Sequence, residues 1–245
     1  MHAQTAERIV EASGVGKDDV VLEIGPGTGM LTRALLKQAG KVVAVEADRE
    51  LVPVLAETFA KEVTDGTLTI VHQDIREFDP ESLGGPYHLV ANIPYYITGE
   101  IIRTFLTTPK KPASMTLLVQ KEVAIRIARD TKESLLSLSV KAYGTPKYCF
   151  TVPRGAFVPK PNVDSAVLHI ANIHSPFATG EEETFFEILR AGFAHKRKFL
   201  ARNLEVVAHG DAIREAFAVT KLGEKTRAED VPLSSWQQLA TLLKK

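Results

Sequence analysis

Glycines gather in one short segment, Glu23-Ile24-Gly25-Pro26-Gly27-Thr28-Gly29, between an apolar run and a helical pattern. Glycine lets the backbone turn tightly and lets a ligand come close to the chain. The spacing is Gly-x-Gly-x-Gly, and Met30 follows, so the Gly-x-Gly-x-x-Gly pattern of dinucleotide sites is not met. Pro26 and the acidic charge of this half of the chain disfavour a pyrophosphate. The segment therefore predicts a turn that holds a cationic cofactor.

Two acidic residues stand where the next two apolar runs end. Glu46 lies 17 residues after Gly29, where a carboxylate can accept hydrogen bonds from both hydroxyls of a ribose. Asp74, in the segment Gln73-Asp74-Ile75, can bind an exocyclic amine, and Ile75 can pack on a purine face. Ligands of such folds lie beyond the carboxyl ends of the strands. Together with the glycine turn, the two acids predict a purine nucleoside site, although an Asp alone here is more often a helix cap.

The segment Asn92-Ile93-Pro94-Tyr95-Tyr96 follows the next apolar run. The amide oxygen of Asn92 and the carbonyl of Pro94 can accept both hydrogens of an aromatic amine, and the ring of Tyr95 can stack on the base. These acceptors turn the nitrogen lone pair towards a methyl donor, so the segment predicts amine methylation. Taken alone, it fits a strand-ending turn with core tyrosines equally well. We expect Tyr96 to be a packing residue.

Strand-like and helix-like patterns alternate about every 20 residues through the part of the chain that carries these groups. This alternation predicts β-α-β units and an α/β fold with a mostly parallel sheet covered on both faces, which would position the groups. The expected strands are 20–24, 41–45, 68–71, 88–91, 115–119, 135–143 and 166–171, and the expected helices between them are 5–13, 30–38, 49–61, 99–106 and 121–129. After a linker-like stretch at 174–180 the periodicity is only helical, at 185–193, 199–207, 211–217 and 234–243. We therefore expect a catalytic domain over residues 1–177 and a small helical domain over residues 178–245.

Composition sets wider limits. The chain has 245 residues, of which 44% are hydrophobic and 24% charged, as in an ordinary globular protein. The single cysteine, Cys149, excludes an internal disulfide framework and a zinc site built on cysteine pairs. No apolar run reaches about 18 residues, and no signal pattern opens the sequence, so we expect a cytoplasmic protein without a membrane partner. We expect a monomer and no metal.

The formal net charge of zero hides an uneven distribution. Residues 1–100 carry 8 basic and 16 acidic side chains, whereas residues 101–160 carry 11 basic and 3 acidic. A local basic patch attracts a polyanion even when the whole chain is neutral. Any single lysine is more often a solvated charge, but as groups the basic side chains predict RNA phosphate contacts. The first group includes Lys110, Lys111, Arg126, Arg129 and Lys160; the second, on helical spacing, is His195, Lys196, Arg197, Lys198 and Arg202.

In order along the chain, Glu23–Gly29, Glu46, Gln73–Ile75 and Asn92–Tyr95 resemble the motifs of S-adenosylmethionine-dependent adenine-N6 methyltransferases. Three later segments resemble one branch of these enzymes, the small-subunit (16S) ribosomal RNA adenine dimethyltransferases that determine kasugamycin sensitivity. These segments are Leu117–Ala124, Phe157–Val167 and Phe193–Lys198. The resemblance covers nearly the whole chain.

The resemblance implies a seven-stranded Rossmann-like class I methyltransferase sheet with a helical C-terminal domain for RNA recognition. It implies methylation of N6 of two adjacent adenines in the 3′-terminal hairpin loop of 16S rRNA, during small-subunit assembly, to give N6,N6-dimethyladenine. The turn of Gly25, Gly27 and Gly29 would hold the methionine part of S-adenosylmethionine. The other implied cofactor contacts are Glu23, Glu46 and Ala47, Asp74 and Ile75, and Asn92. Asn92, Pro94 and Tyr95 would hold the target adenine, with Phe157 as its second stacking wall.

Three other functions stay open. A large-subunit rRNA dimethyltransferase of the macrolide-resistance type shares the cofactor motifs, so only Phe157–Val167 and Phe193–Lys198 favour the 16S target. A non-catalytic assembly factor for the small subunit is favoured by one departure: the printed sequence shows neither the basic arm nor the Gln-x-Phe-Leu motif that usually precedes the first helix. A nicotinamide oxidoreductase is disfavoured by the glycine spacing. No histidine has the surroundings of a general base.

Overall fold

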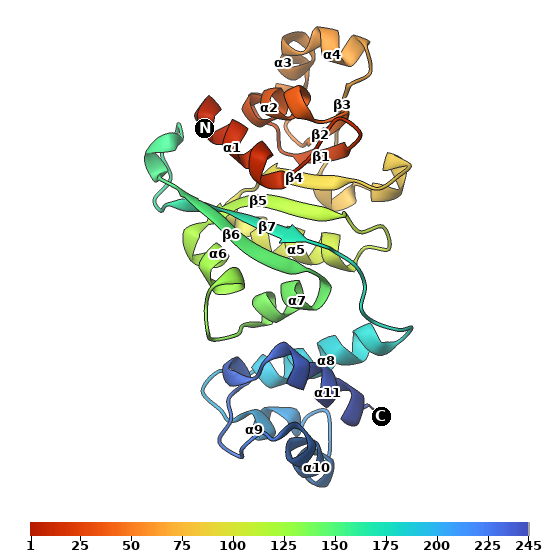
Figure 1. Cartoon of the computed structure of the whole chain (residues 1–245), viewed down its shortest axis with the longest axis vertical. Helices are drawn as coiled ribbons and strands as arrows, with labels where there is room; N and C mark the ends of the chain where they lie inside the picture. Colours follow the sequence, from red (N-terminus) through yellow and green to blue (C-terminus); the bar gives the residue numbers. More distant parts are fainter. Residues whose placement is uncertain (245) are drawn as a thin grey trace. The chain divides into compact units, whose positions relative to one another are not determined.

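A computed structural model describes residues 1–244. The chain forms two compact units (Figure 1). The first comprises Met1–Ala128 and Gly144–His174, and the second comprises Arg129–Tyr143 and the chain from Ser175 onward. None of the described helices is both long and apolar enough to cross a membrane.

The first unit is built on a seven-stranded sheet in the order β3-β2-β1-β4-β5-β7-β6, which confirms the expected sheet. The strand β7 runs antiparallel to both of its neighbours, and the other adjacent pairs are parallel. The strands are β1 (Val20–Ile24), β2 (Lys41–Glu46), β3 (Leu68–His72), β4 (His88–Asn92), β5 (Ser114–Gln120), β6 (Thr145–Val152) and β7 (Ser165–Ala171). The inner strands are largely apolar and buried, as expected for strands covered on both faces, whereas the edge strands β3 and β6 are more polar and more exposed.

Helices α1 to α3 pack on one face of this sheet. Alternate strand residues, among them Val21, Val42 and Val90, share a buried core with Ile9 of α1 and Leu35 of α2. The helices of the unit are α1 (Ala3–Ser13), α2 (Met30–Gln38), α3 (Leu51–Thr58), α4 (Ala60–Thr64), α5 (Thr98–Thr107) and α6 (Lys121–Ala128). Short 3-10 turns follow at η1 (Ile75–Glu77), η2 (Pro80–Leu83), η3 (Tyr95–Ile97) and η4 (Arg154–Ala156).

The order in which the chain adds strands reverses at β1, since β2 and β3 lie on one side of it and β4 and β5 on the other. Ile24, the last residue of β1, pairs with Val45 of β2 and with Ala91 of β4. Gly25, Glu46 and Asn92 therefore stand at one level of the sheet, at its carboxyl edge. Such a switch point is where open α/β sheets bind ligands.

Gly29 is the most tightly packed glycine of the turn, and its replacement should destabilise the fold. Its φ is +79°, and a Cβ there would lie 2.4 Å from Cε2 of buried Phe59. We expect Gly29→Ala to lower the free energy of unfolding by about 2–4 kcal/mol, from left-handed strain plus overpacking. Gly27 (φ +58°) has open space at its Cβ position, so Gly27→Ala should lose only the strain, about 1–2 kcal/mol. Urea unfolding of both variants checks this, and equal losses would contradict it.

The expected strand at 135–143 is wrong, because Leu135–Tyr143 forms the helix α7. A short apolar run does not by itself distinguish a buried strand from a buried helix. Two reciprocal bonds close the first turn: the Ser137 N–H donates to Ser134 Oγ at 3.1 Å, and the Ser134 N–H donates to Ser137 Oγ at 2.7 Å. The true strand, β6, was not predicted, since Pro146 lies within it; β6 is an edge strand, where proline is tolerated.

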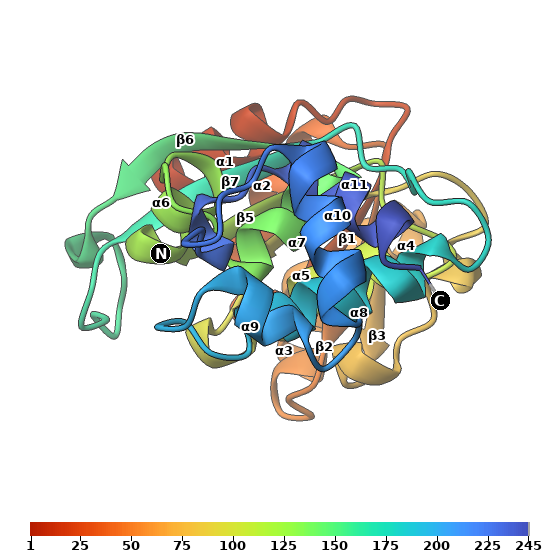
Figure 2. The same ribbon diagram turned by 90° about the horizontal axis from the view of Figure 1, so that it is seen from below.

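The second unit is helical, with α8 to α11 gathered together (Figure 2). Its helices are α7, α8 (Glu181–Phe193), α9 (Leu200–Leu204), α10 (Gly210–Thr220) and α11 (Leu233–Leu242), with a 3-10 turn η5 (Ala228–Asp230). Trp236 is fully buried and stacks on Phe193 at 5.6 Å between ring centroids. Gly192 lets the indole approach, since a Cβ there would lie 2.3 Å from it.

The boundary differs from the expected 177/178 division in one segment, because residues 129–143 pack with the C-terminal helices. The Glu133 N–H donates to the Glu229 carbonyl at 2.8 Å, and Lys132 pairs with Asp230. Tyr143 stacks on Phe186 at 6.0 Å and donates its hydroxyl to Glu182 at 2.6 Å. The apolar face of α7 belongs to this second core, which a boundary placed by composition alone could not indicate.

Candidate active site

A cleft lies at the carboxyl edge of β1, β2, β3 and β4, and it brings together most of the predicted cofactor residues. The predicted residues in its lining are Gly25, Glu46, Ala47, Asp74, Ile75 and Pro94. Gln73, Arg76, Tyr96 and Ile97 also line it, together with Ile24 and Val45. The other predicted cofactor residues, Glu23, Gly27, Gly29 and Asn92, are not in this lining. Glu23 is buried in β1, the two glycines belong to the turn after Gly25, and Asn92 lines a separate pocket.

Glu46 joins the glycine turn to the end of β2. Its carboxylate is buried and accepts the N–H of Gly27 at 3.0 Å and the N–H of Asp48 at 3.0 Å. A carboxylate has about four acceptor positions, so lone pairs remain for two ribose hydroxyls. The same side chain therefore shapes the turn and offers acceptors to the cleft.

Replacing Glu46 should weaken nucleoside binding. We expect Glu46→Ala to raise the Kd for S-adenosylhomocysteine about 10- to 100-fold, because hydrogen bonds to a charged group contribute about 1.5–3 kcal/mol. Glu46→Gln keeps one acceptor oxygen, so its Kd for S-adenosylhomocysteine should lie between those of wild type and Glu46→Ala. Titration calorimetry measures the affinity, with the exposed Glu57→Gln on α3 as the control. A Kd for Glu46→Ala within threefold of wild type would contradict the role.

Glu23 is the least exposed carboxyl of the site. It is fully buried in β1, and neither side-chain oxygen has a hydrogen-bond partner among the described residues. Burial raises the pKa of Glu23 to about 8, and the nearby Glu46 carboxylate adds to the rise. A bound cation next to the glycine turn would favour the ionised form of this carboxyl, so the residues present fit a positively charged nucleoside cofactor.

Asp74 reaches the cleft already paired. Its carboxylate accepts the Arg76 backbone N–H at 2.9 Å and the Arg76 Nε–H at 3.0 Å, and it forms an ion pair with the same guanidinium. The bonds from Arg76 lower the pKa of Asp74 to about 2. Sequence reasoning missed Arg76; the available signal was the acid–x–base spacing across a helix cap. An incoming amine would share these oxygens with Arg76.

A second pocket holds the predicted catalytic residues: Asn92, Pro94, Tyr95 and Phe157, with Ile93, Pro159 and Pro161. The Tyr95 hydroxyl lies 2.7 Å from Ser165 Oγ, which is buried in β7 and fixes the ring. The Pro94 carbonyl accepts the Ile97 N–H at 3.2 Å and keeps one lone pair for a ligand. Pro94 lines both the pocket and the cleft, so one residue separates an amine site from a nucleoside site.

The expectation that Tyr96 packs in the core is wrong. Its side chain is 88% exposed and lies at the cleft. Consecutive side chains in a 3-10 turn diverge by about 120°, so η3 directs Tyr95 inward and leaves Tyr96 outside.

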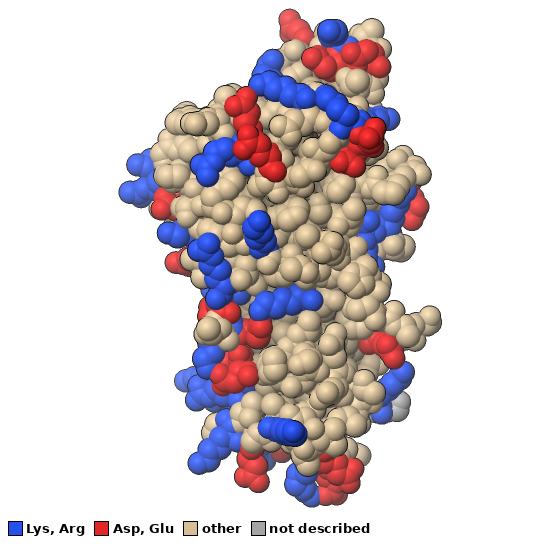
Figure 3. All heavy atoms as spheres, in the orientation of Figure 1, with Lys and Arg blue, Asp and Glu red and all other residues tan. Residues whose placement is uncertain are grey.

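The predicted RNA contacts fall in both units. Lys110, Lys111, Arg126 and Lys160 belong to the first, and Arg129, His195, Lys196, Arg197, Lys198 and Arg202 belong to the second. Lys110 lies 3.9 Å from Glu81, Lys111 donates to the Thr108 carbonyl and Arg202 pairs with Glu205, whereas Arg126, Lys160 and His195–Lys198 are exposed. On the face in Figure 3, basic and acidic side chains are interspersed.

The basic stretch at 195–198 is a turn between α8 and α9, as the expected helix bounds imply, so its helical spacing with Arg202 does not reflect one continuous helix face. Buried Asn203 of α9 holds its start, since Nδ2 donates to the carbonyls of Gly192 at 2.6 Å and His195 at 3.1 Å. The turn presents four consecutive exposed side chains on a fixed base.

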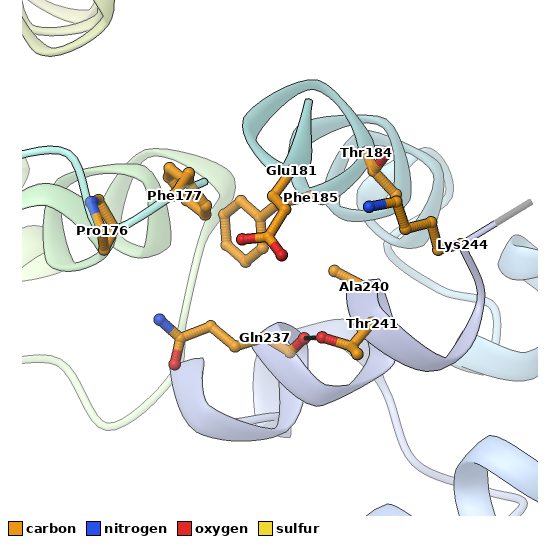
Figure 4. Close-up of a pocket in the computed structure, with 9 residues that line it drawn as sticks. All are labelled: Pro176, Phe177, Glu181, Thr184, Phe185, Gln237, Ala240, Thr241 and Lys244. Carbon is orange, nitrogen blue, oxygen red and sulfur yellow. Dashed lines mark hydrogen bonds between the residues drawn. The ribbon is translucent and has the colours of Figure 1, made fainter. Parts of the chain in front are cut away.

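The second unit has a pocket of its own (Figure 4). Phe177 and Phe185 line one side, and Gln237 and Ala240 of α11 line the other. Glu181 points into it, and its carboxylate also accepts the Ala178 N–H at 3.0 Å. None of the predicted site residues lines this pocket.

Comparison with known proteins identifies the family of the chain. The sequence profile of the family described as "Ribosomal RNA adenine dimethylase" matches residues 2–245. The chain belongs to the ribosomal RNA adenine dimethylase family.

Relatives of this dimethylase are named ribosomal RNA small subunit methyltransferase A. The protein of Dehalococcoides mccartyi strain BAV1 is 40% identical over 242 residues, covering 95% of this chain and 81% of the relative. That of Geobacillus thermodenitrificans is 36% identical over 252 residues, covering 96% and 85%. The shared region therefore includes both units.

Solved structures show the same fold. The 23S rRNA methyltransferase ErmE has a TM-score of 0.80 and 26% identity, covering 100% of this chain and 99% of that one. A dimethyladenosine transferase from Plasmodium falciparum has a TM-score of 0.78 at 22% identity, covering 97% and 94%. The class I methyltransferase fold predicted for this dimethylase is confirmed.

Proposed function

We propose that the protein transfers methyl groups from S-adenosylmethionine to N6 of two adjacent adenines in the 3′-terminal hairpin loop of 16S rRNA. The product is N6,N6-dimethyladenine, formed in the cytoplasm on the small subunit or its precursor by a monomer. One observation carries the proposal: a nucleoside cleft and an aromatic-walled amine pocket share Pro94.

The cleft residues fit the cofactor by their chemistry. Glu23 and the turn at Gly25 would hold the cationic methionine end, Glu46 and Ala47 the ribose, and Asp74 and Ile75 the adenine. When bound, S-adenosylmethionine supplies an electrophilic methyl group. Among the described residues, no cluster of His, Cys, Asp or Glu suits a metal ion.

The pocket residues position the acceptor. The Asn92 amide oxygen and the Pro94 carbonyl accept the amine hydrogens and aim the nitrogen lone pair at the cleft. Tyr95 and Phe157 hold the base between them, after it leaves its stack. In-line displacement needs mainly this positioning, and the amine proton leaves to solvent after transfer.

The names of the relatives support the small subunit as the target, since identity to them is 36–40%, against 26% to the 23S enzyme ErmE. Tritium transfer from labelled S-adenosylmethionine to unmethylated 30S subunits, with 50S subunits in parallel, tests the proposal. Dimethyladenine in 30S supports it. Label only in 50S indicates the large-subunit activity, and 30S binding without label indicates an assembly factor.

The turn at 195–198 should contribute phosphate contacts. We expect Lys196→Glu with Arg197→Glu to weaken 30S binding and to reduce the slope of log K against log salt by about 1–2, because fewer counterions are released. Filter binding at several salt concentrations measures the slope. The matched control reverses the charge of two exposed lysines, one in α2 and one in α4, by Lys37→Glu with Lys61→Glu. An unchanged slope would remove the turn from the interface.

A further inference from the structure

Two apolar side chains beside the pocket have almost no protein contact. Tyr96 is 88% exposed and Val158 is 87% exposed, which makes them the most exposed large hydrophobic side chains of the described residues. Each directly follows one aromatic wall of the pocket, Tyr95 or Phe157. Scattered exposed apolar residues are ordinary, but a pair that brackets one pocket indicates a ligand surface.

Local backbone geometry holds both side chains outward. In η3, Tyr95 is held inward by Ser165, so Tyr96 projects to the other side. Phe157 has extended backbone, with φ −122° and ψ 149°, and packs against the core. Neighbouring side chains of an extended segment point to opposite faces, so Val158 faces solvent because Phe157 faces the core.

The charges around these two side chains favour a polyanion. Arg76 lines the same cleft as Tyr96, and it is 59% exposed although paired with Asp74. Arg154 and Lys160, on the segment that carries Val158, are exposed. Aromatic or apolar surface beside cations is the usual arrangement for single-stranded nucleic acid, because bases stack while phosphates meet positive charge.

We propose that Tyr96 and Val158 contact the two nucleotides that flank the target adenine. The base of one flanking nucleotide stacks on the Tyr96 ring, and the base of the other packs on Val158. The proposal rests on the proposed function, since it assumes an RNA adenine between Tyr95 and Phe157. It makes Tyr96 a residue that positions RNA, distinct from the cofactor contacts of the same cleft.

The test compares Tyr96→Ala, Tyr96→Phe and Val158→Ala in 30S methylation and in S-adenosylhomocysteine binding. Tyr96→Ala should raise the KM for 30S subunits about tenfold, since loss of one base–aromatic stack has an effect of this order. Val158→Ala should raise it about threefold, as expected for a smaller apolar contact. Tyr96→Phe keeps the ring and should match wild type, and the Kd for S-adenosylhomocysteine should stay within twofold throughout. Val206→Ala, at a 77% exposed valine of the second unit, is the control.

Three results would overturn the proposal. A higher Kd for S-adenosylhomocysteine at an unchanged KM would make Tyr96 a cover of the cofactor. Wild-type KM in Tyr96→Ala and Val158→Ala would mean that the two side chains touch no substrate. Weaker binding of Tyr96→Ala to 30S subunits but not to a protein-free 16S rRNA fragment carrying the hairpin would assign the surface to a ribosomal protein. Failure of the proposed function is distinguishable, because the unaltered protein would then leave 30S unlabelled.

Discussion

Replacing Asn92 by alanine should lower kcat for methyl transfer about 10²- to 10³-fold, the effect of removing one fixed polar contact to a reacting group. Asn92 ends β4, where its backbone pairs with Leu118 of β5, so the sheet fixes the position from which the amide side chain extends. Without it, the target nitrogen keeps one acceptor, the Pro94 carbonyl, and its lone pair is no longer fixed. The base still has both aromatic walls, so RNA affinity should change little.

The experiment measures single-turnover methylation, 30S binding and S-adenosylhomocysteine binding on the same preparation. Gln38→Ala is a matched control, since it removes an exposed amide at the end of α2. Loss of turnover together with retained 30S binding is the expected pattern. Normal turnover by Asn92→Ala would show that another group orients the amine.

Replacing Glu23 by glutamine should flatten the dependence of stability on pH. The pKa of Glu23 is about 8 in the folded protein and near 4.5 in the unfolded chain, so the folded state holds one more proton between these values. Stability must then fall as pH rises through this window. Each pKa unit corresponds to about 1.4 kcal/mol, so the contribution reaches a few kcal/mol by pH 8.

Urea unfolding at several pH values between 5 and 8 measures this in the ligand-free protein. Other groups titrate in the same window, among them His169, whose pKa is lowered by burial, so the difference between Glu23→Gln and wild type is the informative quantity. A buried amide also leaves donors unpaired, but that loss does not change with pH. The difference should grow in favour of Glu23→Gln as pH rises, and parallel curves would contradict the raised pKa.

Six of the seven strands could be predicted from the sequence, because most of them are largely apolar runs that end next to polar, chemically distinctive residues. Glu46, Asp74 and Asn92 each follow such a run, and the parallel register then places them at one edge. The pattern failed at 135–143 and 145–152. The apolar run 135–143 forms a helix because it packs in the second unit. The segment 145–152 forms a strand in spite of Pro146 because it lies at the edge of the sheet.

The structure places most of the predicted site residues in two pockets, but residue spacing did not indicate their hydrogen-bond partners. Asp74 was predicted to bind an amine, yet its pairing with Arg76 depends on how η1 closes. Tyr96 was assigned to the core by its type, whereas the direction of a 3-10 turn decides its exposure. Which groups a carboxylate meets, and which way a ring faces, depend on local dihedral angles that residue spacing does not specify.

The composition of the second unit has a consequence for how the chain can be divided. Because 129–143 and the segment from Ser175 form one core, the polypeptide passes between the two units three times. A cut after residue 177 would keep α7 with the first unit but remove Phe186 and Glu182, which contact Tyr143. The apolar face of α7 would then be exposed, so a simple truncation should give an aggregation-prone fragment and not a stable catalytic domain. During synthesis, α7 emerges from the ribosome long before the helices that cover it. The apolar face of α7 therefore stays exposed until the helices of the second unit have been synthesised.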